Sequence, residues 1–76
     1  MSERLPRLTA AQIIKVLEKC GFVCVRQSGS HMIFKNSEGS RATVPYHAGK
    51  ILHPKLLKNI LNEANITTQE LLDILK

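Results

Sequence analysis

Residues 22–46 read FVCVRQSGSHMIFKNSEGSRATVPY, and this stretch decides the fold. Three runs in it, at residues 22–27, 31–36 and 41–46, are rich in β-branched and other apolar side chains, which is typical of strands. The segments that join them are short and contain glycine, so each predicts a tight turn. The three strands should form an antiparallel meander. Pro45 has no N–H to donate, so it must lie at an edge or outside the pairing.

The segment before these strands carries the signals of a helix that begins after Thr9. Thr9 and Gln12 have the spacing of a capping box, in which each side chain accepts a hydrogen bond from the other residue's backbone N–H. Gly21 favours a left-handed stop after the last turn. The apolar residues that share one face of this helix are Ile13, Val16, Leu17 and Cys20.

Two further helices are predicted after the strands. Pro54 takes the first position of the second helix, where its missing N–H costs nothing. Thr67 and Glu70 form another capping box, which begins the third helix. The residues expected to face the core are Leu57, Ile60, Leu61 and Ala64 in the second helix, and Leu71, Leu72 and Leu75 in the third.

These elements predict a single α+β domain over residues 1–76, in the order α-β-β-β-α-α, with residues 1–7 as a short basic lead-in. The helices must bury their apolar faces on one side of the three-stranded antiparallel sheet and leave its other side open. The topology is like that of a double-stranded-RNA-binding domain, although a fold alone does not prove a function.

The chain is basic, with a formal net charge of +5 and a pI of about 9.6. In so small a domain this charge favours a polyanionic partner such as nucleic acid or an anionic membrane surface, although it can also serve solubility alone. A thin core leaves no room for a deep pocket. Function is therefore expected on an open surface that meets a macromolecule.

The expected compartment is the cytoplasm. No apolar run approaches the roughly 20 residues needed to span a bilayer. Pro6 and Arg7 interrupt the apolar residues near the N-terminus, so the pattern of a signal peptide is missing. Cys20 and Cys24 are the only cysteines, and we expect both to be free thiols that serve as apolar filler.

Period-two alternation places the polar residues of the second and third strands on the open side of the sheet. Met32 and Phe34 are bulky and apolar, so they should face the helices. His31, Ile33 and Lys35 then face the open side, and Arg41 and Thr43 should join them, with Ala42 and Val44 inward. The first strand stays ambiguous. If Phe22 and Cys24 face one way, Arg26 should go with them, and the pattern does not decide which way.

The segment GFVCVRQSGSH at residues 21–31 resembles the central motif of the HicA family of toxins. The similarity lies in Gly21-Phe22, Arg26-Gln27 and Gly29-Ser30-His31. Val44-Pro45, His47 and Gly49 resemble the second block of the family, and residues 56–66 resemble its closing helix. The resemblance covers roughly residues 11–75, almost the whole chain.

This resemblance implies the toxin of a type II toxin–antitoxin system, held inactive by a HicB-like antitoxin. Such toxins are mRNA interferases that cut RNA without a metal ion and depend on one histidine, which maps to His31. The implied protein needs no cofactor.

The residues themselves suit the same chemistry. An exposed histidine can take the proton of a 2′-hydroxyl at physiological pH, so His31 is the candidate general base. Arginine or lysine can stabilise the charge that develops on the phosphorane. The expected products are a 2′,3′-cyclic phosphate and a 5′-hydroxyl. No general acid that would protonate the leaving 5′-oxygen is evident from the pattern, and His47 is the one candidate besides His31. Alternatively, His47 and His53 are ordinary loop and helix-start residues.

The residues expected to contact RNA are Arg26, Ser30, Lys35, Arg41, Lys50, Lys55 and Lys58. Lys55 and Lys58 lie near the start of the second helix, where backbone amides can also bind phosphate; alternatively, they form a solvated helix face. Ser30 can equally be a turn residue, because adjacent strand residues point to opposite faces and no acidic residue stands ready to orient a Ser–His pair.

Two other functions compete with the nuclease. The chain could be a non-catalytic double-stranded-RNA-binding module that reads the shape of A-form RNA. It could also be a protein-interaction adaptor. A pure binder does not need the Gly-Ser-His element, and an adaptor would show no salt-dependent RNA binding.

Overall fold

The computed structural model describes residues 5–76, so the first four residues of the predicted lead-in lie outside the described part. In chain order the elements are α1 (Ala10–Lys19), β1 (Val23–Ser28), β2 (His31–Lys35), β3 (Arg41–Pro45), α2 (Pro54–Ala64) and α3 (Thr68–Leu75). This order and the antiparallel sheet β1-β2-β3 confirm the predicted α+β fold. Each predicted strand agrees with the observed one to within one residue at either end.

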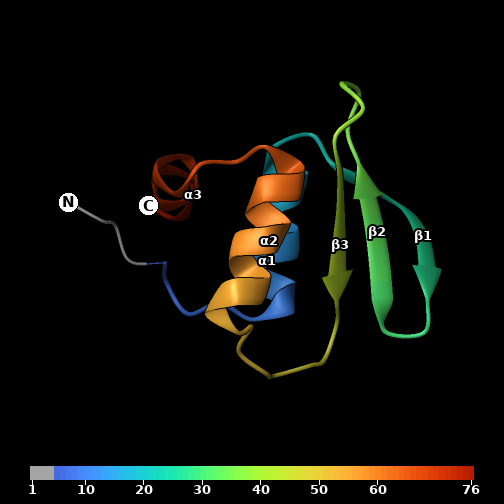
Figure 1. Cartoon of the computed structure of the whole chain (residues 1–76), viewed down its shortest axis with the longest axis horizontal. Coiled ribbons are helices and arrows are strands. Elements are labelled where there is room, and N and C mark those ends of the chain that lie inside the picture. Colours follow the sequence, from blue (N-terminus) through green and yellow to red (C-terminus); the bar gives the residue numbers. More distant parts are fainter. Residues whose placement is uncertain (1–4) are drawn as a thin grey trace.

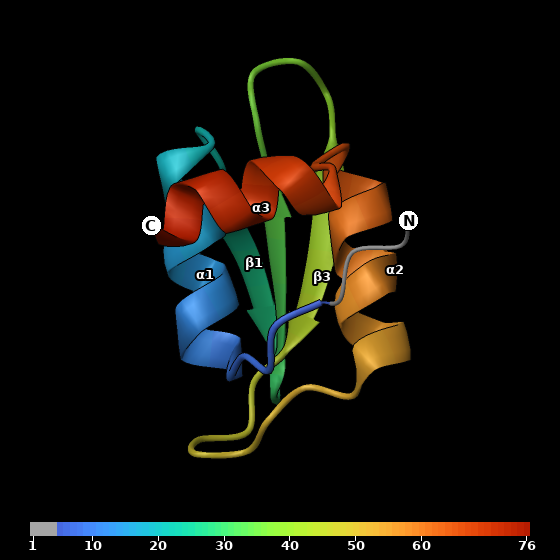
Figure 2. The same cartoon turned by 90° about the vertical axis from the view of Figure 1, so that its left-hand side faces the viewer.

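The molecule has a sheet on one side and helices on the other (Figure 1). Seen from the helical side, α1 and α2 run alongside the sheet, and α3 crosses in front of them (Figure 2). Both α1 and α2 contact β3. β1 lies farthest from the helices in Figure 1, and all six of its residues are exposed. The face of the sheet turned away from the helices is left open, as predicted.

The register of the sheet confirms the predicted alternation in β2 and β3. Phe34 pairs with Ala42, and Met32 pairs with Val44. Phe34 and Ala42 are buried, and Met32 packs against the core. His31 and Lys35, on the opposite face, are exposed. The helix-side face of these two strands therefore belongs to the core, and the other face meets solvent.

A β-bulge at Val25 decides which face of β1 carries Arg26, which the sequence pattern left open. Cys24 pairs with Phe34 and Arg26 pairs with Ile33, so the register shifts by one residue between them. Paired residues share a face, and Arg26 therefore lies on the open side while Cys24 lies on the helix side. The expectation that Arg26 follows Cys24 is wrong, because the extra residue of a bulge reverses the alternation.

The buried core lies between the helices and the inner face of the sheet. Its residues are Leu8, Ala10, Ile13, Val16, Leu17, Phe22, Phe34, Ala42, Val44, Leu52, Leu57, Ile60, Leu61, Ala64, Ile66 and Leu71. Cys20 packs against this core as predicted, but Cys24 is exposed, because β1 is the strand farthest from the helices (Figure 1). The prediction of apolar filler is thus wrong for Cys24.

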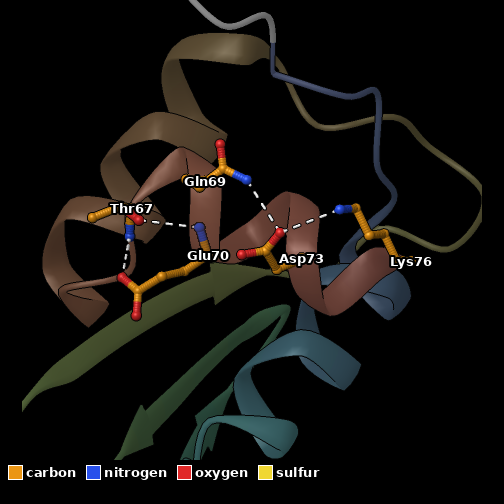
Figure 3. Close-up of polar contacts among 5 residues, drawn as sticks. All are labelled: Thr67, Gln69, Glu70, Asp73 and Lys76. Atoms are coloured by element: carbon orange, nitrogen blue, oxygen red, sulfur yellow. Dashed lines mark hydrogen bonds and ion pairs between the residues drawn. The ribbon is translucent and has the colours of Figure 1, made fainter.

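Both predicted capping boxes are present. In the first, the Gln12 side chain accepts a hydrogen bond from the Thr9 N–H at 2.8 Å. In the second, Glu70 Oε1 accepts from the Thr67 N–H at 2.9 Å, and Thr67 Oγ1 accepts from the Glu70 N–H at 3.1 Å (Figure 3). Each box satisfies amides that the first turn of a helix leaves without partners.

The third helix is less buried than its leucine pattern suggested. Leu71 is fully buried, Leu72 is half-buried and Leu75 is 41% exposed. α3 crosses the other helices near one end of the sheet and finds its main partner in α1 (Figure 2). Only part of its apolar face is therefore covered, and the prediction that Leu72 and Leu75 point inward is wrong for Leu75.

Candidate functional site

His31 begins β2 at one end of the open face. Across the sheet it pairs with Ser28 on one side and Pro45 on the other. Gly29, in the two-residue connection between β1 and β2, has a φ of +57°, which glycine adopts without strain. The Tyr46 N–H donates to the Ser30 carbonyl at 2.6 Å, which ties this turn to the end of β3. The imidazole is thus presented to solvent beside a turn that is hydrogen-bonded to the end of β3.

Two more cross-strand rows continue along the same face. The middle row consists of Arg26, Ile33 and Thr43, and the far row of Val23, Lys35 and Arg41. Val25, Arg26, Ile33, Lys35 and Arg41 line a shallow depression of about 240 Å³. The structure therefore brings Arg26, Lys35 and Arg41 together on the face of His31, which lies one row from Arg26 and two rows from Lys35 and Arg41.

The basic residues of this face have no acidic partners. Within residues 5–76 the only ion pair joins Lys76 to Asp73, at 3.6 Å on α3 (Figure 3). Glu63 on α2 accepts a hydrogen bond from the Thr43 N–H at 3.3 Å, and Glu38 lies in the turn between β2 and β3, but neither carboxylate forms an ion pair with the basic residues of this face. The open face therefore carries an uncompensated positive charge, which suits an anionic partner.

A comparison with known protein families bears on this arrangement. The family described as "HicA toxin of bacterial toxin-antitoxin" matches residues 10–66. The match spans three quarters of the chain and includes α1, the whole sheet and α2. The chain belongs to the HicA toxin family. A search of curated proteins found no match. Membership of the family makes this protein a toxin of a toxin–antitoxin system, with an antitoxin as its partner.

The remaining predicted RNA contacts of this HicA toxin are spread out. Lys50 borders a small hollow of about 120 Å³ together with His47, in the loop after β3. Lys58 lines a different hollow, formed by the end of α2 and the start of α3. Lys55 is exposed in the first turn of α2, where its N–H donates to Nδ1 of His53 at 3.1 Å. Lys50 and Lys58 therefore do not share one hollow, and the hollow of Lys50 also includes Pro45, the cross-strand partner of His31.

Ser30 and His53 have clear structural roles in this toxin. Ser30 is half-buried, its carbonyl accepts the Tyr46 N–H, and the alternation places its side chain opposite that of His31. His53 is the N-cap of α2. The interpretation of His53 as a helix-start residue is confirmed.

Ser28, Val25 and Ile33 belong to the open face but were not among the site residues predicted from the sequence. Ser28 lies directly opposite His31, and the other two form the apolar floor of the depression. Ile33 was placed on the correct face, but nothing marked it as part of a site. A bulge leaves no periodic signal, so neither Ser28 nor Val25 could be assigned to a face from alternation.

The cysteines do not offer a nucleophile at this face. Burial raises the pKa of the Cys20 thiol, and the nearby Glu70 carboxylate raises it further, so the reactive thiolate is disfavoured. Cys24 lies on the helix side of β1. In the described part of the chain, no three histidine, cysteine or acidic side chains are grouped so that they could hold a metal ion. No helix there is long and apolar enough to cross a membrane.

Proposed function

We propose that this HicA toxin is an mRNA interferase: a metal-independent endoribonuclease that cuts RNA through the substrate's own 2′-hydroxyl, with His31 as general base. A HicB-like antitoxin would hold it inactive in the cytoplasm until release. The observation that carries the proposal is the position of His31, exposed at a glycine turn on the uncompensated basic face.

The proposed reaction uses that position in one transfer of a proton and one displacement at phosphorus. The neutral imidazole of His31 takes the proton of the 2′-hydroxyl, and the 2′-oxygen attacks the adjacent phosphorus. The bond from phosphorus to the 5′-oxygen breaks, and that oxygen leaves with a proton from water or a protein acid. The products are a 2′,3′-cyclic phosphate and a 5′-hydroxyl. His47, two residues beyond the partner of His31 in β3, is the candidate acid.

Arg26, Lys35 and Arg41 are the cations proposed to hold the substrate on the open face. Arginine presents a planar fork of donors that matches phosphate, so Arg26 and Arg41 can each bind two of its oxygens. Lys50, Lys55 and Lys58 would add weaker, longer-range attraction from the loop and α2, and Ser30 would add a contact at the turn. These cations would also stabilise the negative charge of the phosphorane.

We expect the purified toxin, freed of antitoxin, to cut single-stranded RNA equally fast with magnesium and in excess EDTA. The reason is that the proposed base and nucleophile are a side chain and the substrate itself, so no step requires a bound cation. Products should be examined on sequencing gels, with acid treatment to open the cyclic phosphate. Tight binding of duplex RNA with no cutting under either condition would instead support the RNA-binding module, which the topology also favours.

RNA binding should weaken steeply with salt. If three to five phosphates contact the basic face, the slope of log K against log salt should be about −2 to −4. Arg41→Gln should flatten the slope by about 0.7 to 0.9, the share of one phosphate. Lys15→Gln on α1, away from the sheet, is the matched control and should leave it unchanged. The titration uses 2′-O-methyl RNA, which the toxin cannot cut. RNA affinity that does not change with salt would contradict the proposal that this basic face binds the RNA.

A further inference from the structure

We propose that the depression around Ile33 is a separate subsite, which holds a backbone phosphate and its sugar two to four nucleotides away from the cleaved phosphate. The inference deepens the proposed function and rests on it, since it assumes that RNA lies across the open face with the cleaved phosphate at His31. The toxin would bind the substrate strand more tightly through this second contact, which takes no part in the cleavage step.

The β-bulge creates this subsite. Under strict alternation, Arg26 would share the helix-side face with Cys24 and Phe34. The extra residue at Val25 instead places Arg26 opposite Ile33, on the open face. Arg26 then lines the depression together with Lys35 and Arg41, which come from two other strands. Bulges are frequent beside functional sites because they redirect a side chain in this way.

The positive charges that line the depression favour the binding of an anion. It brings together two guanidinium groups and one ammonium group, and no carboxylate lines it. The only ion pair within residues 5–76 joins Lys76 to Asp73, so none of the three cations of the depression is paired with a carboxylate. Like charges around one hollow repel each other, and a bound phosphate would turn that repulsion into attraction. The floor of Ile33 and Val25 is apolar, which suits the carbon face of a ribose.

The register gives the distance from the proposed cleavage point. Ile33 and Lys35 follow His31 by two and four residues on β2, and a strand rises about 3.3 Å per residue, which gives about 7 to 13 Å. A stacked nucleic-acid strand advances about 3.4 Å per nucleotide. The depression therefore lies about two to four nucleotides from the phosphate at His31.

The occupant should be the backbone rather than a base. Phe22 and Phe34 are buried, and Tyr46 follows the end of β3, so the described part of the open face has no aromatic ring beside the depression. Stacking on aromatic rings is the usual way to hold an unpaired base. The subsite should consequently tolerate any sequence at that position and add affinity for strands long enough to reach it.

The test uses a short RNA that the wild-type toxin cuts at one mapped position. Methylphosphonates, which are uncharged, replace the phosphates one at a time on both sides of the cut. We expect KM to rise roughly five- to tenfold when the neutral group lies two to four nucleotides from the cut on one side, with kcat unchanged. Arg26→Gln combined with Arg41→Gln should raise KM on unmodified RNA and remove the sensitivity at that position. Lys15→Gln should behave like wild type.

Several results would overturn the subsite. One is a methylphosphonate effect that is equal along the whole strand, and another is full sensitivity in the double variant. A change confined to inhibition by the antitoxin would assign the depression to the protein partner instead. If the wild-type toxin cuts no RNA, the proposed nuclease function fails separately. Binding of 2′-O-methyl RNA then still decides about the depression, because the double variant must bind more weakly than Lys15→Gln.

Discussion

His31→Ala should lower the rate of RNA cleavage by about 10²- to 10⁴-fold, which is the usual contribution of a positioned general base. Binding should change little, because the cations that hold the substrate are untouched. Stability should change by less than about 0.5 kcal/mol, since the imidazole is exposed and no core contact is lost. Expression of the variant in a susceptible bacterium should no longer stop growth.

His53→Ala is the matched control, because it also removes an exposed histidine. Nδ1 of His53 accepts the Lys55 N–H and caps α2, so its loss should cost about 1 kcal/mol of stability and leave cleavage intact. The two substitutions should therefore change different quantities: His31→Ala lowers the cleavage rate, and His53→Ala lowers the free energy of unfolding. Cleavage rates and thermal unfolding should be measured for both. An alanine variant at His31 that is folded and still cuts at the wild-type rate would remove His31 from the mechanism.

The parts of the fold that sequence reasoning predicted are those with strong local signals. Thr9 and Thr67 mark their helices through capping boxes, which depend only on residues three apart. The face of His31 followed from its place beside Met32 and Phe34, because these bulky apolar side chains could only point toward the helices. Local spacing and binary pattern were sufficient there.

Two of the errors concern how much of the apolar surface the helical layer covers. Cys24 and Leu75 are apolar and were expected inside, yet β1 is the strand farthest from the helices and α3 is only partly covered. Whether an apolar residue is covered depends on the relative lengths and angles of distant elements, which no local pattern contains.

The sequence predicted which strand residues share the face of His31, but it did not predict the positions of Arg26 and of the lysines after β3. His31, Lys35 and Arg41 lie on one face as expected, but the position of Arg26 depends on a bulge that alternation cannot reveal. The lysines at residues 50, 55 and 58 are near one another along the chain, yet Lys50 and Lys58 border different hollows. Spacing along the chain was a poor guide to proximity once a loop and a helix end intervened.

A single 2′-deoxy substitution in the substrate should have the largest effect of all. The 2′-hydroxyl just 5′ of the cut phosphate is the proposed nucleophile, so its removal leaves His31 with no proton to take and phosphorus with no attacking oxygen. The Cys24 thiol faces the helices, and Ser28 carries a protein hydroxyl on the open face opposite His31, so cutting that survives the deoxy substitution would point to Ser28 or water. Binding of the strand should be unchanged, because the contacts are to phosphates.

The decisive measurement compares cutting of two RNA strands that differ only by one oxygen, at the sugar 5′ of the mapped cut, in excess EDTA. A strand with the deoxy sugar one nucleotide farther away serves as the control for altered sugar shape. We predict full cutting of the unmodified and control strands and no detectable cutting at the deoxy position. Cutting at the deoxy position would mean that water or a protein group is the nucleophile, and it would contradict the cyclic-phosphate mechanism even if His31 proved essential.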